Sequence, residues 1–429
     1  MSRNRSCHKW SSMIYPWVLW TIAASFFFYK YLIQVSPSVM TFDLMKVFEV
    51  NGAGLGNLSA FYFYAYLVMQ IPVGILLDKY SPRLLTTGAI FLCSISTFIF
   101  AQTTTLWLAC IARAFMGAGA AFAAVSCFKL ASLWFPSKRF ALVSGMFMTA
   151  AMLGAVGGQM PLSLLVQHAG WRMALVIVSF AGILLGILYF IIVRDKSIRT
   201  ASTIKHEDES SYSFATIIRN KQTWFLSLYS GLAFAPVSVF GGLWGVPFLE
   251  TAYHLSRTDA AFAVSTIFIG FAVGAPIWGW LSDFIGQRKP ILFFGTVLAL
   301  MCLSIVIYST TLQSFSLIAL LFSFGFGTSG FFTSFAMIRE LFSLTLAATV
   351  LGFMNTFDSL CEALYEPLVG AFLDWTWDGK IMNGIHQFSL YGYHVSLILL
   401  PLSLVLALAI LFFIQETYCR TKDENLAKP

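Results

Sequence analysis

Apolar runs of about 20 residues recur along the whole chain, and they constrain its fold more than any other feature. A helix of this length crosses the roughly 30 Å hydrocarbon core of a bilayer. The composition agrees, because 58% of the 429 residues are hydrophobic, only 10% are charged, and the mean hydropathy is +0.79. No soluble domain of this size tolerates such a surface, so we expect an integral membrane protein.

Twelve runs are predicted to span the membrane, with errors of a few residues at their ends. They cover residues 15–36, 57–77, 84–102, 106–130, 140–166, 172–193, 223–249, 259–281, 290–310, 313–337, 345–367 and 393–415. The first run is too long for a cleavable signal peptide and is followed by further spans, so we expect it to remain in the mature protein.

Basic residues are distributed unevenly between the two sides of these spans. With the N-terminus inside, the cytoplasmic segments hold 20 of the 26 lysines and arginines, whereas the outer loops hold only Lys46, Arg172, Arg257 and Lys380. This positive-inside pattern predicts a plasma (inner) membrane protein with both termini in the cytoplasm. The net charge of +7 therefore indicates topology and attraction to anionic lipids of the bilayer, and no nucleic-acid partner is expected.

The cysteines and histidines carry no metal-binding pattern. The seven cysteines lie in predicted spans or cytoplasmic tails without CxxC spacing, and the six histidines form no HxxxH or HExxH pair. We therefore expect no disulfide framework, no metal and no cofactor. Because the chain also shows no nucleophile–base set and no phosphate-cradling glycine loop, an enzyme is not expected.

One polar segment divides the spans into six plus six. It begins "RDKSIRTAST" after the sixth span, so we divide the chain into an N-terminal bundle of residues 1–193, a cytoplasmic linker of residues 194–222, and a C-terminal bundle with a cytoplasmic tail, residues 223–429. Gly74 and Asp78 in the first half recur as Gly279 and Asp283 in the second, both 205 residues later. This duplication predicts an all-α membrane protein of two pseudo-symmetric six-helix bundles around a central cavity.

Several segments resemble the signatures of one transporter family. "GILLDKYSPR" (74–83) and "GWLSDFIGQRK" (279–289) are similar to the loop motif of the major facilitator superfamily, "RAFMGAG" (113–119) is similar to its Arg-x-x-x-Gly element, and "GWR" (170–172) precedes the sixth span as it does there. The resemblance covers essentially the whole chain. It implies a secondary active transporter, a monomer, that moves a small molecule by alternating access.

The resemblance also implies a substrate class. The stretches "SPSVM", "LSAFYFYAYLVMQIPVG" and "GGLWGVPFL" look most like bacterial importers of amino acids and other small metabolites, including those of intracellular bacteria, and lysosomal dipeptide carriers. Gly145, Gly154 and Gly158 are spaced as in the antiporter signature but lack its Gly-Pro pair. Uptake of an amino acid or small peptide in symport with a proton is the first hypothesis, and proton-driven efflux of a drug, siderophore or other metabolite is the alternative. A receptor that only signals is a third hypothesis, which the short central linker disfavours.

The repeated loop motif is predicted to be a gate. Gly74 would let helices approach closely, and the Asp78 carboxylate would sit against the N-terminal end of a neighbouring helix. The resemblance implies that this neighbour is the eleventh span and that the contact stabilises the outward-facing state. For Lys79 and Arg83 alone, a solvated basic loop is the competing interpretation. Gly279, Asp283 and Arg288 form the corresponding set in the second half.

Lys30 and Arg113 are the two cations inside predicted spans. Each costs roughly 2.5–3.5 kcal/mol to insert at mid-helix, so neither is expected to face lipid. Their counterparts 205 residues later are Ala235 and Ile318, so the repeat itself does not require either charge. Both therefore belong to function or to a local ion pair. The resemblance implies that the first and fourth spans line the central cavity, where such cations meet a substrate carboxylate, and snorkelling of Lys30 to the outer headgroups is its alternative.

The eleventh span contains a stripe of carboxylates. Asp358, Glu362 and Glu366 follow one another at i, i+4 and i+8 on one helical face. Three like charges so close together in a low dielectric do not all remain ionised cheaply, so at least one is expected to hold a proton near neutral pH and to couple transport to protons. In the alternative interpretation, Glu366 meets water and Asp358 pairs with a cation. Lys30 is a possible partner of this stripe.

Aromatic residues near these charges complete the predicted site. Tyr29 lies next to Lys30, and Tyr62 and Tyr66 share a face of the second span, where tyrosines donate hydrogen bonds to a polar substrate or pack in the core. Trp244 in the seventh span is assigned to the same site.

Pro236, Gly241, Gly242 and Pro247 surround Trp244 in the seventh span. They predict a kinked or broken helix there, serving as a hinge or as a static kink.

Overall fold

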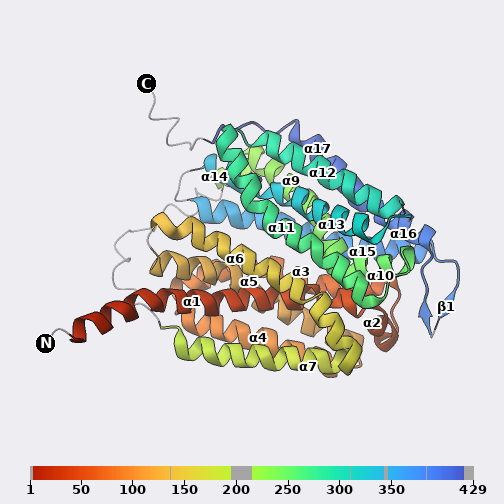
Figure 1. Ribbon diagram of the computed structural model, residues 1–429, viewed down its shortest axis with the longest axis horizontal. Helices are drawn as coiled ribbons and strands as arrows, with labels where there is room; N and C mark the ends of the chain where they lie inside the picture. The colour runs from red at the N-terminus through yellow and green to blue at the C-terminus, as the bar shows by residue number, and fades with distance from the viewer. Residues whose placement is uncertain are drawn as a thin grey trace.

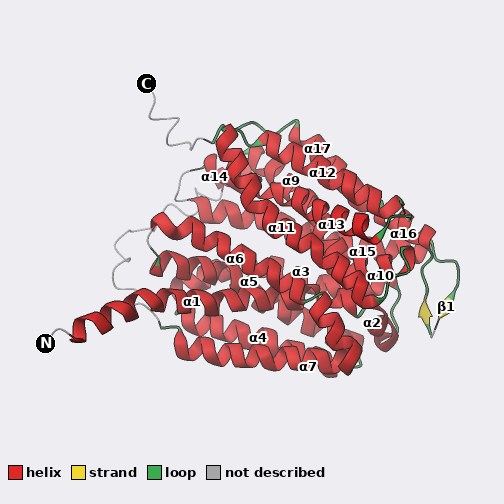
Figure 2. Cartoon of the chain, viewed as in Figure 1, coloured by secondary structure: helices red, strands yellow, loops and turns green. Residues whose placement is uncertain are grey.

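The chain folds into two side-by-side bundles of helices. The computed structural model describes residues 3–135, 137–194, 215–309, 311–342, 346–382 and 384–419. Figure 1 shows the red-to-yellow helices of the first half together on one side and the green-to-blue helices of the second half on the other, and Figure 2 shows that nearly all of the described chain is helical. Most of the predicted linker, residues 195–214, and the end of the tail, residues 420–429, lie outside the described residues.

The first bundle contains six long helices. They are α1 (Arg3–Val35), α3 (Gly52–Lys79), α4 (Pro82–Gln102), α5 (Leu106–Trp134), α6 (Ser137–Gly157) and α7 (Met160–Ile192). The backbone of α7 turns at Gly170, whose φ of 78° is in the left-handed region that favours glycine. The fifth predicted span therefore consists of α6 and the start of α7, and the sixth follows the kink at Gly170.

The second bundle contains six spans that are more often interrupted. Its helices are α9 (Lys221–Val239), η3 (Phe240–Trp244), α10 (Gly245–Ala252), α11 (Arg257–Ile285), α12 (Lys289–Tyr308), α13 (Ser314–Thr328), η4 (Ser329–Phe332), α14 (Thr333–Glu340), α15 (Ala347–Trp375), α16 (Leu390–Leu397) and α17 (Leu399–Leu411). The η3 turn is a π-helix that contains Gly241 and Gly242, which confirms the predicted break in the seventh span.

These helices make twelve membrane crossings. Within the described part of the chain, nine stretches are long and apolar enough to span a bilayer, and one of them, Leu142–Ile192, has 51 residues and turns at Gly170, so it crosses twice. The more polar helices α3 and α15 complete the set. The predicted all-α, two-bundle architecture is confirmed.

Three short elements were not predicted, and all lie at one end of the bundles. They are η1 (Ser36–Val39), α2 (Thr41–Phe48) and an antiparallel hairpin of β1 (Ile381–Met382) and β2 (Ile385–His386). We call this end the opposite face, and the end where α1 begins and α17 ends the terminal face (Figure 1). The positive-inside pattern predicts that the terminal face is cytoplasmic.

Glycines allow several helix pairs to touch backbone to backbone. A Cβ on Gly270 of α11 would lie 2.0 Å from the carbonyl oxygen of Phe322 in α13, and one on Gly154 of α6 would lie 2.1 Å from that of Phe28 in α1. Gly158 approaches the carbonyl of Leu32 in the same way, at 2.7 Å. Two glycines of the antiporter-like pattern therefore have a packing role against α1.

Replacing Gly270 by alanine is expected to lower the melting temperature of the detergent-solubilised protein. The new methyl group forces α11 away from α13, and such overpacking costs about 1–3 kcal/mol. Gly279→Ala on the same helix is the matched control, because no atom of the described residues lies within 4 Å of its Cβ position, and its melting temperature should be unchanged. Equal melting temperatures for the two variants would contradict the close contact of α11 with α13.

Candidate substrate site between the bundles

A small cavity lies between the two bundles. The bundles meet where α3 packs against α15 and where α11 packs against α6 and α7. The cavity measures about 30 Å³ and is lined from α1, α3, α9 and α15 by Lys30, Tyr31, Gln34, Tyr62, Phe63, Tyr66, Phe234, Asn355, Asp358, Ser359 and Glu362. Residues of both bundles therefore line one polar cavity.

Lys30 points into this cavity from α1. Its residue surface is only 4% exposed, and its Nζ donates a hydrogen bond of 2.5 Å to Oε1 of Gln34, one turn further along the helix. The same Nζ lies 3.7 Å from the ring centre of Tyr31 and 4.9 Å from that of Tyr66. Aromatic faces stabilise a cation that has lost water. The alternative that Lys30 snorkels to the headgroups is wrong for this structure.

Two carboxylates of α15 face the same cavity. Asp358 accepts a hydrogen bond of 2.6 Å from the Ser230 hydroxyl of α9, and Oε1 of Glu362 has no hydrogen-bond partner among the described residues. Between described residues, no carboxylate oxygen lies within 4.0 Å of Lys30 Nζ, so the predicted partnership takes the form of a shared cavity without an ion pair. Asp358 is bound to a hydroxyl, which differs from the alternative of a cation partner.

Glu366 lies one turn beyond the cavity, toward the opposite face. Its surface is 1% exposed, so the alternative that it meets water is wrong for this structure. Its backbone carbonyl accepts a hydrogen bond of 3.1 Å from Nε1 of Trp244. Trp244 is thus held inside the second bundle and does not line the cavity, where the sequence had placed it.

Arg113 and Tyr29 also lie away from the cavity. Arg113 Nη1 donates to the Ile33 carbonyl at 3.0 Å, and Nη2 to that of Gln34 at 3.4 Å. The last carbonyl groups of a helix lack partners within it, so Arg113 of α5 satisfies the C-terminal end of α1. Tyr29 faces Gly182 of α7 inside the first bundle. Through its hydrogen bonds to the Ile33 and Gln34 carbonyl groups, Arg113 positions the helix that carries Lys30.

Sequence reasoning missed several residues that line the cavity or bind its acids. Gln34 follows Lys30 by four positions, Asn355 precedes Asp358 by three, and Ser359 precedes Glu362 by three, so helical spacing around the charges could have found these three. Ser230 had no such signal, because it comes from α9 and meets Asp358 only through packing.

The opposite face is closed by contacts between the bundles. The Asp374 carboxylate at the end of α15 accepts hydrogen bonds from the backbone N–H groups of Gly52 at 2.8 Å and Ala53 at 2.7 Å, at the start of α3. Its negative charge suits the unpaired N–H groups of a helix N-terminus.

Two further contacts cross between the bundles at the same face. Arg257 of α11 forms an ion pair of 2.9 Å with Asp43 of α2. Nε2 of Gln159 donates at 2.6 Å to the carbonyl of Gly241 in the π-helix, where the backbone pattern is broken. The opposite face is therefore held by charged and neutral hydrogen bonds from several helices.

The described contacts at the terminal face differ from those at the opposite face. The hydrogen bonds and ion pairs that join described residues of the two bundles include several at the opposite face, from Asp374, Gln159, Ser163, Thr258 and Arg257. Among the described residues, no atom lies within 4 Å of a Cβ placed on Gly74 or Gly279, and the close approach of helices at Gly74 stays a prediction. Arg83 Nε donates to the Phe190 carbonyl of its own bundle at 2.8 Å. Lys79 is exposed, and the side chain of Asp78 lies outside the described ones.

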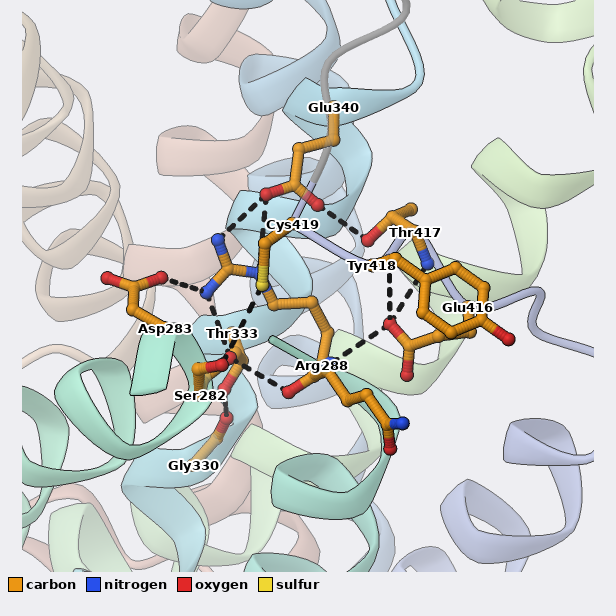
Figure 3. Close-up of polar contacts among 11 residues, drawn as sticks. Ser282, Asp283, Arg288, Gly330, Thr333, Glu340, Glu416, Thr417, Tyr418 and Cys419 are labelled. Carbon is orange, nitrogen blue, oxygen red and sulfur yellow. Dashed lines mark hydrogen bonds and ion pairs between the residues drawn. The ribbon is translucent and has the colours of Figure 1, made fainter. Parts of the chain in front are cut away.

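The second copy of the motif forms a charge cluster within its own bundle (Figure 3). Arg288 pairs with Asp283 at 2.7 Å and with Glu340 of α14 at 2.8 Å. Burial lowers the pKa of Arg288, but the hydrogen bonds that Arg288 donates to the carboxylates of Glu340 and Asp283, together with their negative charge, more than offset it, so this pKa is raised. Glu416, beyond α17, accepts from the backbone N–H groups of Arg288 and Lys289. The α11–α12 turn is thereby tied to α14 and to the segment after α17.

The chain matches a known family along nearly its whole length. A family model described as the Major Facilitator Superfamily matches residues 18–245 and again residues 226–427. The chain belongs to the Major Facilitator Superfamily. Two matches of this kind agree with the duplication inferred from the repeated loop motif.

Individual relatives of the superfamily cover most of the chain. It is 24% identical to a probable L-galactonate transporter of Escherichia coli (strain K12), over 80% of each chain. It is 22% identical to a hexuronate transporter of Bacillus subtilis (strain 168), over 81% of this chain and 85% of that protein. Both relatives are named for sugar acids, so the predicted branch of amino-acid and dipeptide carriers is not supported.

Solved structures show the same fold. A bacterial homologue of the human lysosomal transporter Spinster, in an inward-facing and unoccupied conformation, superimposes with a TM-score of 0.76 at 17% identity, covering 96% of this chain and 98% of that one. The nucleoside transporter NupG gives a TM-score of 0.73 at 14% identity, covering 92% of this chain and 100% of that one.

Asp374→Asn is expected to open the opposite face more often. Charged hydrogen bonds contribute about 1.5–3 kcal/mol each, so losing the charge should raise the labelling rate of a buried reporter about ten-fold. The reporter is Val35→Cys, at a position only 3% exposed, in a background without the native cysteines, labelled by an impermeant maleimide. Asp378→Asn, whose partner Lys380 lies in the same exposed loop, is the control. Equal labelling in the two variants would show that Asp374 does not hold this face shut.

Proposed function

We propose that this secondary transporter takes up a small sugar acid together with a proton, with the substrate carboxylate bound by Lys30. Membership of the superfamily and the two-bundle fold establish the transporter class. The substrate, the proton and the direction are the proposed part. The observation that carries the proposal is a buried lysine in a polar cavity between the bundles, with no carboxylate within ion-pair distance among the described residues.

Lys30 has the properties of an anion-binding group. A buried ammonium group is stable only when it is paired or well hydrogen-bonded, and here one amide oxygen and two aromatic rings are its contacts. A substrate carboxylate would supply the missing opposite charge. The amide groups of Gln34 and Asn355 and the hydroxyl group of Tyr66 line the same cavity and suit the hydroxyl groups of a sugar acid.

The size of the cavity requires a change of state for substrate to bind. A volume of about 30 Å³ is enough for a water molecule but not for a six-carbon acid. The bundles must therefore move apart at one face to admit substrate. Because the described contacts hold the opposite face, the terminal face is the one that opens from this state, as alternating access requires.

The two acids of the cavity give a reason for proton coupling. Asp358 and Glu362 share the cavity with Lys30, so an incoming anion would meet two carboxylates. Protonation of one carboxylate removes a repulsion and makes the binding of an anion less costly. Substrate and proton would then enter together. Uptake is preferred to efflux because Gly154 and Gly158, from the pattern that suggested efflux, have a packing role.

Lys30→Ala is expected to raise the KM for sugar-acid uptake by roughly ten- to a hundred-fold, because a charged contact contributes about 1.5–3 kcal/mol. The assay is uptake of radiolabelled L-galactonate or D-glucuronate into proteoliposomes under an imposed pH gradient, acidic outside. Lys380→Ala, in an exposed loop, is the matched control. Unchanged uptake by the Lys30 variant would remove this residue from the site.

An amino acid or small peptide is a second candidate, because Lys30 and the acids Asp358 and Glu362 offer both charges that a zwitterion needs. Asp358→Asn separates the two substrate classes. An ammonium group that lost Asp358 would bind at least about ten-fold more weakly, whereas a sugar acid would bind as well or better. Thermal shift of the purified protein against both solute classes measures this. Wild-type protein stabilised by amino acids alone would reject the sugar-acid proposal.

A further inference from the structure

Glu366 is a buried carboxyl group that the proposed substrate site does not use. We infer that Glu366 takes up the co-transported proton from the opposite face, at a site separate from the substrate cavity. The inference rests on the proton coupling proposed above and divides the acids of α15 into two functions. Asp358 and Glu362 line the cavity, whereas Glu366 does not.

The surroundings of Glu366 favour a protonated carboxyl group in this state. The residue is 1% exposed, and its Oε2 has no hydrogen-bond partner in the described part of the chain. A buried carboxylate without full pairing costs several kcal/mol, and the neutral acid costs less because it carries no charge to desolvate. The Oε1 atom lies 4.0 Å from the Cβ position of Gly242, so the group faces the π-helix.

The charged and titratable groups around Glu366 come from three helices. They are Arg113 of α5, Tyr64 of α3 and Glu362 on the preceding turn of α15, and the Ser59 hydroxyl of α3 lies beside the carboxyl group. Arg113 forms no ion pair with it within 4.0 Å, since its guanidinium donates to the end of α1 and to Ser59. Arg113 is nevertheless the cation that would stabilise the carboxylate once the proton has left.

Access to Glu366 is controlled by the contact between α3 and α15. A Cβ on Gly56 of α3 would lie 2.4 Å from the backbone carbonyl oxygen of Glu366, so the two backbones touch at this residue. Asp374 holds the same two helices together two turns further along. Opening the opposite face must separate α3 from α15 and bring water to Glu366. The carboxyl group is therefore exposed from that face in one state and sealed in the other.

The proton has a short path from Glu366 to the cavity. Glu362 lies four residues earlier on the same helical face, at a Cβ separation of about 5–6 Å, and its Oε1 also has no partner among the described residues. The proton passes from the Glu366 acid to the Glu362 carboxylate, directly or through one water molecule. Glu366 is left as a carboxylate near Arg113, and Glu362 then releases the proton toward the terminal face when the cavity opens there.

Glu366→Gln tests this assignment, because glutamine keeps the size of the side chain and removes its proton. In proteoliposomes, accumulation of labelled D-glucuronate driven by a pH gradient should fall at least ten-fold. Counterflow, the exchange of labelled outer for unlabelled inner D-glucuronate without a gradient, should stay within two-fold of wild type. Glu49→Gln, an exposed acid of the opposite face, is the matched control and should change neither. Wild-type accumulation by the Glu366 variant, or loss of counterflow together with accumulation, would overturn the inference.

A substrate-independent measurement separates this inference from the proposed function. The melting temperature of the purified wild type should fall as pH rises from 5 to 9, because a proton held in the folded state is lost at high pH. The profile of Glu366→Gln should be flatter, and that of Glu49→Gln should follow the wild type. Identical profiles for all three proteins would overturn the role of Glu366. Wild-type protein without counterflow of any sugar acid would reject only the proposed substrate.

Discussion

The free-energy cost of burying charged side chains among apolar helices constrains the rest of this structure. Lys30 is buried with one amide oxygen and two aromatic rings as its contacts, and Arg113 is buried against the carbonyl groups that end α1. Neither cation has a carboxylate within ion-pair distance among the described residues. A buried cation without a carboxylate partner is stabilised by an anion, or by water, that comes close to it. A carrier needs such a group at its centre, because its substrate then binds there by supplying the opposite charge.

The two faces of the protein differ in how the bundles are joined. At the opposite face, Asp374 binds the start of α3, Gln159 binds the π-helix, and Arg257 binds α2. At the terminal face, the charge cluster of Arg288 remains inside the second bundle (Figure 3). Contacts within a bundle survive when the bundles rock, whereas contacts between bundles must break. This difference identifies the helices whose separation alternates during transport.

Much of the fold was predictable because hydrophobic length and repetition are local properties of the chain. The twelve spans, the broken seventh helix and the two-bundle architecture follow from apolar runs, from Gly and Pro positions and from a repeated motif. The site was predictable in part. Lys30, Tyr62, Tyr66, Asp358 and Glu362 meet in one cavity, but Tyr29, Arg113 and Trp244 do not line it. A helix in a bundle has several buried faces, and the sequence does not indicate which of them meets the other bundle.

The sequence by itself determined that the chain crosses a membrane twelve times in two related halves, and that unmatched charges lie in the first and eleventh spans. Only the tertiary structure decided which charges share a space. In the folded chain, Ser230 donates a hydrogen bond to Asp358, the backbone of Gly56 contacts that of Glu366, and Asp374 accepts hydrogen bonds at the start of α3. These contacts join residues far apart in the chain, and they depend on helix rotation and on close glycine packing, which hydrophobic periodicity does not encode.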